Sequence, residues 1–279
     1  MSPEVLAEGQ SSVRAAFGWS TDFSLVEGSY LVDVETRTVN LEGWHSPVEG
    51  LQVGLRVPFI WRGGGDLDAF IDSFHRFFSF PRGGRERLPD DRYTIAGVNY
   101  DNSVFSFRES GFELGDATLG AKYLITPGDE NFPAWSSLFE VRLPTASEET
   151  YGQNAIDLTW GALGSKRWGD LAAYTGAAYI YYGDMHSDRL TYERHHFEGF
   201  FSLEYLLADY FALELGVYGA SRSVRGVFDF PGYATYIDSG AKIRLGQGTF
   251  LELLVRENPS PVEASADVTF LVALAQVGL

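Results

Sequence analysis

Asp72, Ser73 and His75 bring a carboxylate, a hydroxyl and an imidazole within four residues. Acyl transfer uses this set, with serine as nucleophile, histidine as base and an acid that orients the base. Residues one to three positions apart on a helix do not form that line, so partners would have to come from elsewhere. We favour local capping or hydrogen bonding of these polar groups, and we predict no catalytic residue.

Histidine and aspartate also gather in one later segment. His186 lies near Asp184 and Asp188, and His195 and His196 follow. Adjacent histidines on a strand point to opposite faces, so the last two cannot easily bind one ion. A solvated acidic loop is favoured over a divalent-ion site. We expect neither a metal nor a cofactor.

A larger set of charged side chains alternates with apolar residues, which places the charges on one face of extended segments. Glu140, Glu204 and Glu214 could do acid–base work, but the interleaved arginines and lysines favour ion-pair lining. Desolvating so many charges in the core of a soluble protein would be costly, whereas the water in a barrel lumen solvates them. The predicted lumen-lining residues are Arg56, Glu140, Arg142, Glu198, Glu204, Glu214, Lys242, Arg244 and Arg256.

Strands of period two would carry these charges. Residues 51–62 alternate without a break, with Leu51, Val53 and Leu55 on one face and Gln52 and Arg56 on the other. The other clear strands are 13–23, 116–125, 135–143, 197–205, 211–217 and 237–245. Less regular strands are expected at 30–44, where the alternation changes phase near Arg37, and at 156–168, 171–182, 249–257 and 267–279.

The connections between these strands differ in length. Two residues, 169–170, link one pair, whereas about fifty, 63–112, link another. Transmembrane barrels have short turns on one rim and long loops on the other, while a soluble β-sandwich, the alternative, has no reason to sort its connections. We therefore predict an all-β fold, a transmembrane antiparallel up-and-down β-barrel of about twelve strands, as one domain over residues 1–279.

Tryptophans support a membrane position. Trp61, Trp135 and Trp168 stand at ends of predicted strands on the apolar face, as the aromatic girdles of membrane barrels require. Trp160 departs from this rule, because the predicted strand places it in mid-strand.

Composition narrows the function classes. The formal net charge of -17 argues against nucleic-acid partners, and the absence of cysteine excludes disulfides and thiolate chemistry. The start, Met1-Ser-Pro-Glu-Val, lacks the basic and apolar segments of a signal peptide. This start fits either an intracellular protein or a mature form with an added methionine. The barrel prediction requires the mature form.

The long segment 63–113 stands out because it is rich in arginine. Apolar residues at helical spacing predict an amphipathic helix over 66–77, and 93–107 predicts a hairpin. The basic groups either fold into the barrel mouth as a constriction or bind anionic head groups outside, and the acidic lining favours the first. The predicted constriction residues are His75, Arg76, Arg82, Arg85, Arg87 and Arg92.

The same segment resembles a known family. Its pattern of Phe74-His75, Phe78, Pro81, Gly83-Gly84-Arg85, Pro89 and Tyr93 is similar to that of an uncharacterised bacterial family of outer-membrane-type β-barrel proteins. The resemblance implies fold and location and does not imply an activity. The chain ends in Leu279, where such barrels customarily end in phenylalanine.

These observations predict a narrow outer-membrane channel or transporter for small solutes, with a charged lumen constricted by the arginine-rich loop. Its expected partners are outer-membrane lipid, lipopolysaccharide and a small solute. Two alternatives stay open, namely a membrane-embedded lipid-modifying hydrolase and a nonconducting structural or surface-interaction barrel. The hydrolase would need one of His75, His186, His195 and His196 as its base.

Overall fold

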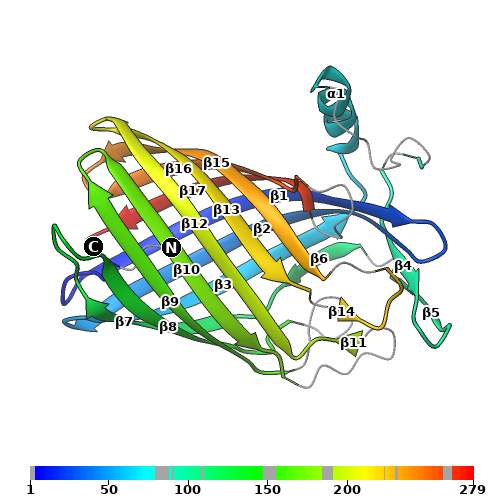
Figure 1. Cartoon of the computed structure of the whole chain (residues 1–279), viewed down its shortest axis with the longest axis horizontal. Coiled ribbons are helices and arrows are strands. Elements are labelled where there is room, and N and C mark those ends of the chain that lie inside the picture. Colours follow the sequence, from blue (N-terminus) through cyan, green and yellow to red (C-terminus); the bar gives the residue numbers. More distant parts are fainter. Residues whose placement is uncertain are drawn as a thin grey trace.

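The computed structural model describes residues 4–78, 88–89, 91–107, 110–146, 155–183, 191–222, 224–229, 232–259 and 266–279. Within these residues, twelve strands close into an antiparallel barrel, because β1 pairs with β2 on one side and with the last strand, β17, on the other (Figure 1). The predicted all-β up-and-down barrel is confirmed. Its strands are β1 Ser11–Val26, β2 Tyr30–Val48, β3 Leu51–Gly63, β7 Thr118–Thr126, β8 Ala134–Arg142, β9 Asp157–Trp168, β10 Leu171–Tyr181, β12 His195–Ala208, β13 Phe211–Ser221, β15 Tyr233–Gly246, β16 Thr249–Glu257 and β17 Ala266–Val277.

The alternation seen in the sequence becomes an outer and an inner wall. On β8, Phe139 is 47% exposed while its neighbour Glu140 is 8% exposed, because the apolar side chain points away from the barrel and the carboxylate points into it. Large apolar side chains are exposed at alternate positions around the wall, for example Val13, Leu41, Leu55, Leu119, Leu158, Phe201, Leu215, Ile237, Leu253 and Leu274. This is the pattern of a barrel whose outer wall faces lipid.

Strand β9 carries a tryptophan near each of its ends. Trp168 is its last residue, and Trp160 is its fourth, so Trp160 does not lie in mid-strand. Eight residues at about 3.3 Å per residue, tilted by about 40°, separate the two rings by roughly 20 Å along the barrel axis. That spacing is close to the height of a bilayer's apolar band, so Trp160 fits the girdle rule after all.

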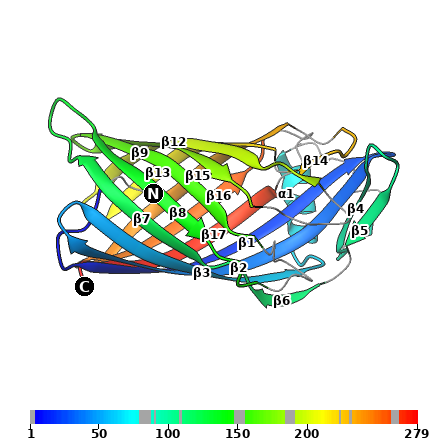
Figure 2. The same ribbon diagram turned by 90° about the horizontal axis from the view of Figure 1, so that it is seen from below.

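The two rims differ as predicted. The C-terminus and the short turns after β2, β7, β9, β12 and β15 lie at one end, which we call the short-turn rim, and the long connections lie at the other, the long-loop rim (Figures 1 and 2). One short turn, 27–29, lies at the long-loop rim. At the short-turn rim, the backbone N–H groups of Phe132 and Asn131 donate to Asp129 and lower its pKa.

The long segment after β3 contains the predicted helix and hairpin, as α1 (Asp68–Phe78) and as β4 (Thr94–Val98) paired with β5 (Val104–Phe107). β4 also extends the sheet along the free end of β2, and β6 (Gly111–Leu114) pairs with the end of β3. A two-stranded sheet of β11 (Thr191–Tyr192) and β14 (Val224–Arg225) completes the long-loop side. No helix in the described residues is long and apolar enough to cross a bilayer.

The apparent phase slip near Arg37 is absent. β1 and β2 pair without a shift from Ser11–His45 to Val26–Tyr30. Arg37 points outward, and its guanidinium lies 5.0 Å from the ring centroid of Trp19 and 4.9 Å from that of Trp61. The outer face of β2 turns polar there because the start of the α1 segment covers it: Glu35 accepts a hydrogen bond from the Leu67 backbone N–H.

Candidate functional site in the barrel lumen

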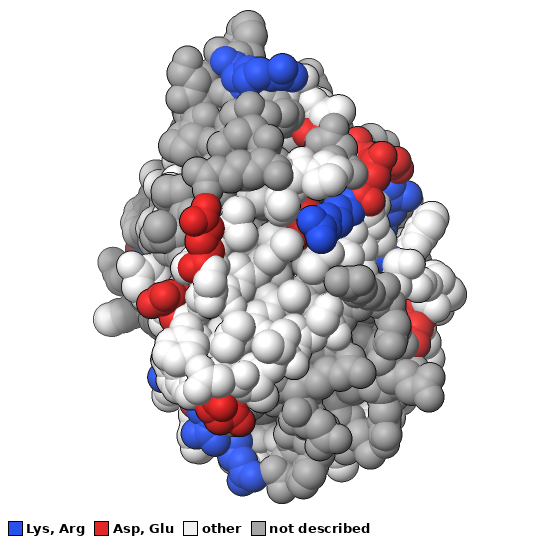
Figure 3. All heavy atoms as spheres, turned by 90° about the vertical axis from the view of Figure 1, so that its right-hand side faces the viewer, with Lys and Arg blue, Asp and Glu red and all other residues white. Residues whose placement is uncertain are grey.

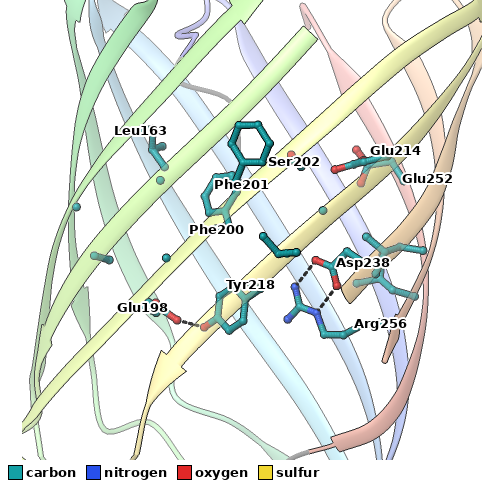
Figure 4. Close-up of a pocket in the computed structure, with 18 of the residues that line it drawn as sticks. Leu163, Glu198, Phe200, Phe201, Ser202, Glu214, Tyr218, Asp238, Glu252 and Arg256 are labelled. Atoms are coloured by element: carbon teal, nitrogen blue, oxygen red, sulfur yellow. Dashed lines mark hydrogen bonds and ion pairs between the residues drawn. The ribbon is translucent and has the colours of Figure 1, made fainter. Parts of the chain in front are cut away.

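The inward side chains leave a cavity of about 480 Å³ in the middle of the lumen. Figure 4 shows part of its lining, with side chains from β9, β12, β13, β15 and β16 turned toward the same space. Eight charged residues take part, namely Arg14, Glu140, Glu198, Glu214, Asp238, Lys242, Glu252 and Arg256.

Some lumen charges pair directly across neighbouring strands. Arg256 on β16 faces Asp238 on β15 in register and binds both carboxylate oxygens, at 2.7 and 2.8 Å. Its guanidinium also lies 4.6 Å from the ring centroid of Tyr218. Arg142 on β8 likewise pairs with Asp157 on β9. These two-point contacts fix the arginines against the wall of the lumen.

Other pairs reach over an intervening strand that carries a small residue. Ala172 on β10 stands in register between Arg167 on β9 and Glu204 on β12, and the two charged groups meet above it at 3.4 Å. Long side chains two strands apart can meet only if the residue between them is short. Two further pairs are similar: Arg14–Glu252 at 2.8 Å over the alanines of β17, and Arg56–Glu140 at 3.4 Å over Thr118 and Gly120 of β7. Lys242 is different, because it pairs both with Glu214 on the intervening β13, at 3.4 Å, and with Glu204 on β12, at 2.8 Å.

The structure places most of the predicted lumen residues in this network. Five of them line the cavity, and Arg56, Arg142 and Glu204 make the ion pairs just described. Arg244 is different, because it lies at the short-turn rim and donates to the carbonyl oxygen of Asp209. The sequence-based list missed five charged residues of these pairs, although the same alternation could have found them: Arg14, Asp157, Arg167, Asp238 and Glu252.

The helix of the arginine-rich segment lies against the outside of the barrel. Phe70 on α1 packs edge-on against the outward-facing Phe270 of β17, with ring centroids 5.9 Å apart. Arg76 donates to Ser73 on the same exposed helix surface, and Arg92 donates to Thr94 at the start of β4. None of these contacts is in the mid-lumen cavity. Outside the described part of the chain lie Arg82, Arg85, Arg87 and the side chain of His75.

The N-terminal residues enter the short-turn mouth. Residues 7–10 turn back at the rim, where the Gly9 N–H donates to the Ser46 carbonyl. Glu4 then lies inside, where its carbonyl oxygen accepts a 2.6 Å hydrogen bond from the Lys122 ammonium. The segment therefore occupies part of this mouth.

The long-loop mouth contains a small apolar core. Val227, from the connection between β13 and β15, is 2% exposed and packs with Tyr30 of β2 and Phe105 of β5. Three strands, β1, β17 and β16, separate these elements in the sheet. The contact thus links distant parts of the long-loop rim, where basic and acidic groups both reach the surface (Figure 3).

The groups that suggested catalysis make local contacts. Ser73 donates to the carbonyl oxygen of Ala69 at 2.8 Å, one helical turn back. His196 lies 3.1 Å from the Ser221 hydroxyl, but His196 is buried and Ser221 also accepts from the Phe197 N–H. No group of three or more metal-ligating side chains gathers in the described ranges.

Comparisons place this geometry among known barrels. The family model described as "Protein of unknown function (DUF3187)" matches residues 1–276, and no curated protein sequence matches the chain. The structure is similar to the COG4313 outer membrane channel from Pseudomonas putida F1, with a TM-score of 0.68 and 13% identity over 98% of this chain and 97% of that one. It is also similar to the NanC porin, with a TM-score of 0.50 and 9% identity over 96% and 100% of the two chains. Identities this low show the fold, which is that of outer-membrane channel barrels.

Proposed function

The chain belongs to the DUF3187 family. From the barrel, its lumen and the likeness to outer-membrane channel barrels, we propose that it is an outer-membrane channel that passes small solutes through a narrow, charged lumen. The observation that carries the proposal is the mid-lumen cavity of about 480 Å³, enclosed by a closed barrel and lined by ion pairs.

An outer-membrane location is supported by the wall. Apolar side chains cover its outer face, tryptophans stand near both ends of β9, and turns and loops are sorted between the rims. Lipid would contact this wall, and lipopolysaccharide would contact the long-loop end.

Narrow conduction is supported by the ion pairs. A twelve-stranded barrel encloses a space that side chains can partly fill. Each ion pair holds two long side chains in fixed positions on the inner wall. Solutes would pass between these fixed charges, so size and charge would decide which ones cross. The contacts at the two mouths, Glu4 with Lys122 and Val227 with Tyr30, would limit entry further.

The role of the arginine-rich segment remains a prediction. Its helix packs outside the wall, which supports a position among lipid head groups for Arg76, whereas Arg82, Arg85 and Arg87 lie outside the described residues. A filter built from those three arginines is still the alternative that the acidic lining favours.

Single-channel recording tests both ideas. The detergent-folded protein, verified by heat-modifiable migration on a gel, is inserted into a planar bilayer with and without residues 66–92. Discrete current steps from the intact chain support the channel, and silence from verified barrels would overturn it. Larger steps from the shortened chain support an arginine filter, whereas unchanged steps assign the arginines to a role outside the lumen.

A further inference from the structure

The two sides of the mid-lumen cavity differ in chemistry. One side, from β13, β15 and β16, carries charged residues, including Glu214, Asp238 and Arg256. Further round the wall, β9 and β10 contribute only uncharged residues among those described, with Leu163 on β9 and Gly176 on β10, and β8 beside them adds Leu138 and Glu140. Figure 4 shows Leu163 well apart from the Asp238–Arg256 pair. The cavity is therefore amphipathic.

Glycine makes the uncharged side smooth. A Cβ added at Gly176 would lie 2.4 Å from the ring of Phe200 and 2.9 Å from a methyl carbon of Leu163. Phe200, which points inward from β12, thus lies close against the backbone of β10, in space that any side chain at position 176 would fill. Leu163 and Leu138, which also line the cavity, are 4% and 5% exposed. Together these residues form an apolar surface that faces the cavity.

The charges of the cavity are unbalanced. Its lining holds five carboxylates and three cationic groups, a formal excess of two negative charges. Arg14, Lys242 and Arg256 each already have a carboxylate partner. Glu198 pairs with none of these three cationic groups. In the described part of the chain, its Oε2 accepts a hydrogen bond from the neutral Tyr218 hydroxyl. A cation entering the lumen would find this carboxylate without a cationic partner.

Glu198 and Phe200 are two residues apart on β12, so their side chains point to the same side. Their Cα atoms are separated by roughly 6.6 Å along the strand, so one small ligand can contact both side chains. We propose that the cavity is a binding subsite for a small amphipathic organic cation, with its ammonium group at Glu198 and its apolar body on Phe200 and Leu163. The proposal rests on the channel function for its access route, but the binding itself does not.

The test compares four probes that differ in one property each. 2-Phenylethylammonium has both the charge and the ring, 2-phenylethanol lacks the charge, ethylammonium lacks the ring, and phenylacetate reverses the charge. Isothermal titration calorimetry with the detergent-folded barrel measures affinity, and planar bilayers measure block of the ion current by the same probes. We expect 2-phenylethylammonium to bind at least tenfold more tightly than each of the others.

Variants assign the site. Glu198→Gln should weaken 2-phenylethylammonium binding at least tenfold and leave 2-phenylethanol binding unchanged, whereas Phe200→Ala should weaken both. Glu130→Gln, in the exposed turn after β7, is the matched control and should change neither. Each variant is first checked for heat-modifiable migration, so that only folded barrels are compared.

The outcomes separate this inference from the channel proposal. Binding with the expected pattern in a barrel that carries no current would keep the subsite and overturn the channel. Current steps without preferential binding of 2-phenylethylammonium, or equal affinity in Glu198→Gln and the unaltered protein, would overturn the subsite and keep the channel. Tighter binding of phenylacetate would overturn the assigned charge.

Discussion

Lys122 and Glu4 connect the lumen wall to the N-terminal segment, because the Lys122 ammonium donates to the Glu4 carbonyl oxygen at 2.6 Å. Glu4 also lines a smaller cavity of about 200 Å³ near the β7–β8 turn, together with Lys166 and Tyr174. One side chain thus holds a backbone segment in the short-turn mouth, and a channel must either pass solute around that segment or release it.

We predict that Lys122→Met raises single-channel conductance or open probability. A hydrogen bond from a charged donor contributes about 1.5–3 kcal/mol, so its loss should favour release of the segment about tenfold or more. Lys166→Met is the control, since that ammonium instead binds the carbonyl oxygens of Asp129 and Phe132. Identical recordings from Lys122→Met and the unaltered protein would contradict a plugging role for the segment.

At the long-loop mouth, Val227→Asp should open the contact with Tyr30 and Phe105. Val227 is 2% exposed, and burying a carboxylate there costs several kcal/mol, which exceeds what so small a core can offset. We expect faster hydrogen exchange in β4 and β5 and larger current steps. Val104→Asp, at a 76% exposed position of the same hairpin, should leave both unchanged; slow exchange in Val227→Asp would argue against the link.

Trp44 makes two glycine positions intolerant of a side chain. A Cβ at Gly54 would lie 2.4 Å from the Trp44 ring, and one at Gly120 would lie 2.7 Å from it. Gly54→Ala should therefore lower the free energy of unfolding by about 1–3 kcal/mol, measured by urea unfolding in detergent. Gly43→Ala, where the nearest atom is 4.0 Å away, should cost much less. Equal effects of the two changes would show that Trp44 moves aside freely.

Removing one partner of the Arg256–Asp238 pair should destabilise the barrel more than replacing both partners. Arg256→Met leaves the Asp238 carboxylate without its partner and should cost about 1–3 kcal/mol of unfolding free energy, less than for a dry core because the lumen is wet. The double change Arg256→Met with Asp238→Leu should recover most of that loss. A double variant as unstable as the sum of the single variants would mean that the two residues act independently.

Arg37→Gln should loosen α1 from the outer wall. It removes two cation–π contacts and the ion pairs with Glu35 at 2.8 Å and Asp66 at 2.5 Å. We expect amide hydrogen exchange of α1 to accelerate by about tenfold, since each such contact contributes about 0.5–1 kcal/mol. Arg76→Gln, on the exposed helix surface, should change exchange little, and no acceleration in Arg37→Gln would leave the helix held by its apolar side alone.

The strands, their number and their orientation followed from the sequence, because period-two alternation is local. From Leu51 to Trp61 every second residue is apolar, and these side chains share one face whatever the rest of the chain does. A closed barrel is the fold in which such apolar faces contact lipid. The helix and the β4–β5 hairpin were also predictable from local spacing and turn residues. Most lumen-lining charges followed from the same parity.

Tertiary structure alone decided which charges meet. Arg167 and Glu204 pair because the strand order brings Ala172 between them. No local sequence pattern shows which two strands will lie on either side of a third. The outward Arg37 looked like a break in the pattern because the residues that cover it come from a distant segment. The contrast between Phe200 and the Asp238–Arg256 pair likewise needed the strand order, since each strand shows only its own inner face and β13 alone separates β12 from β15.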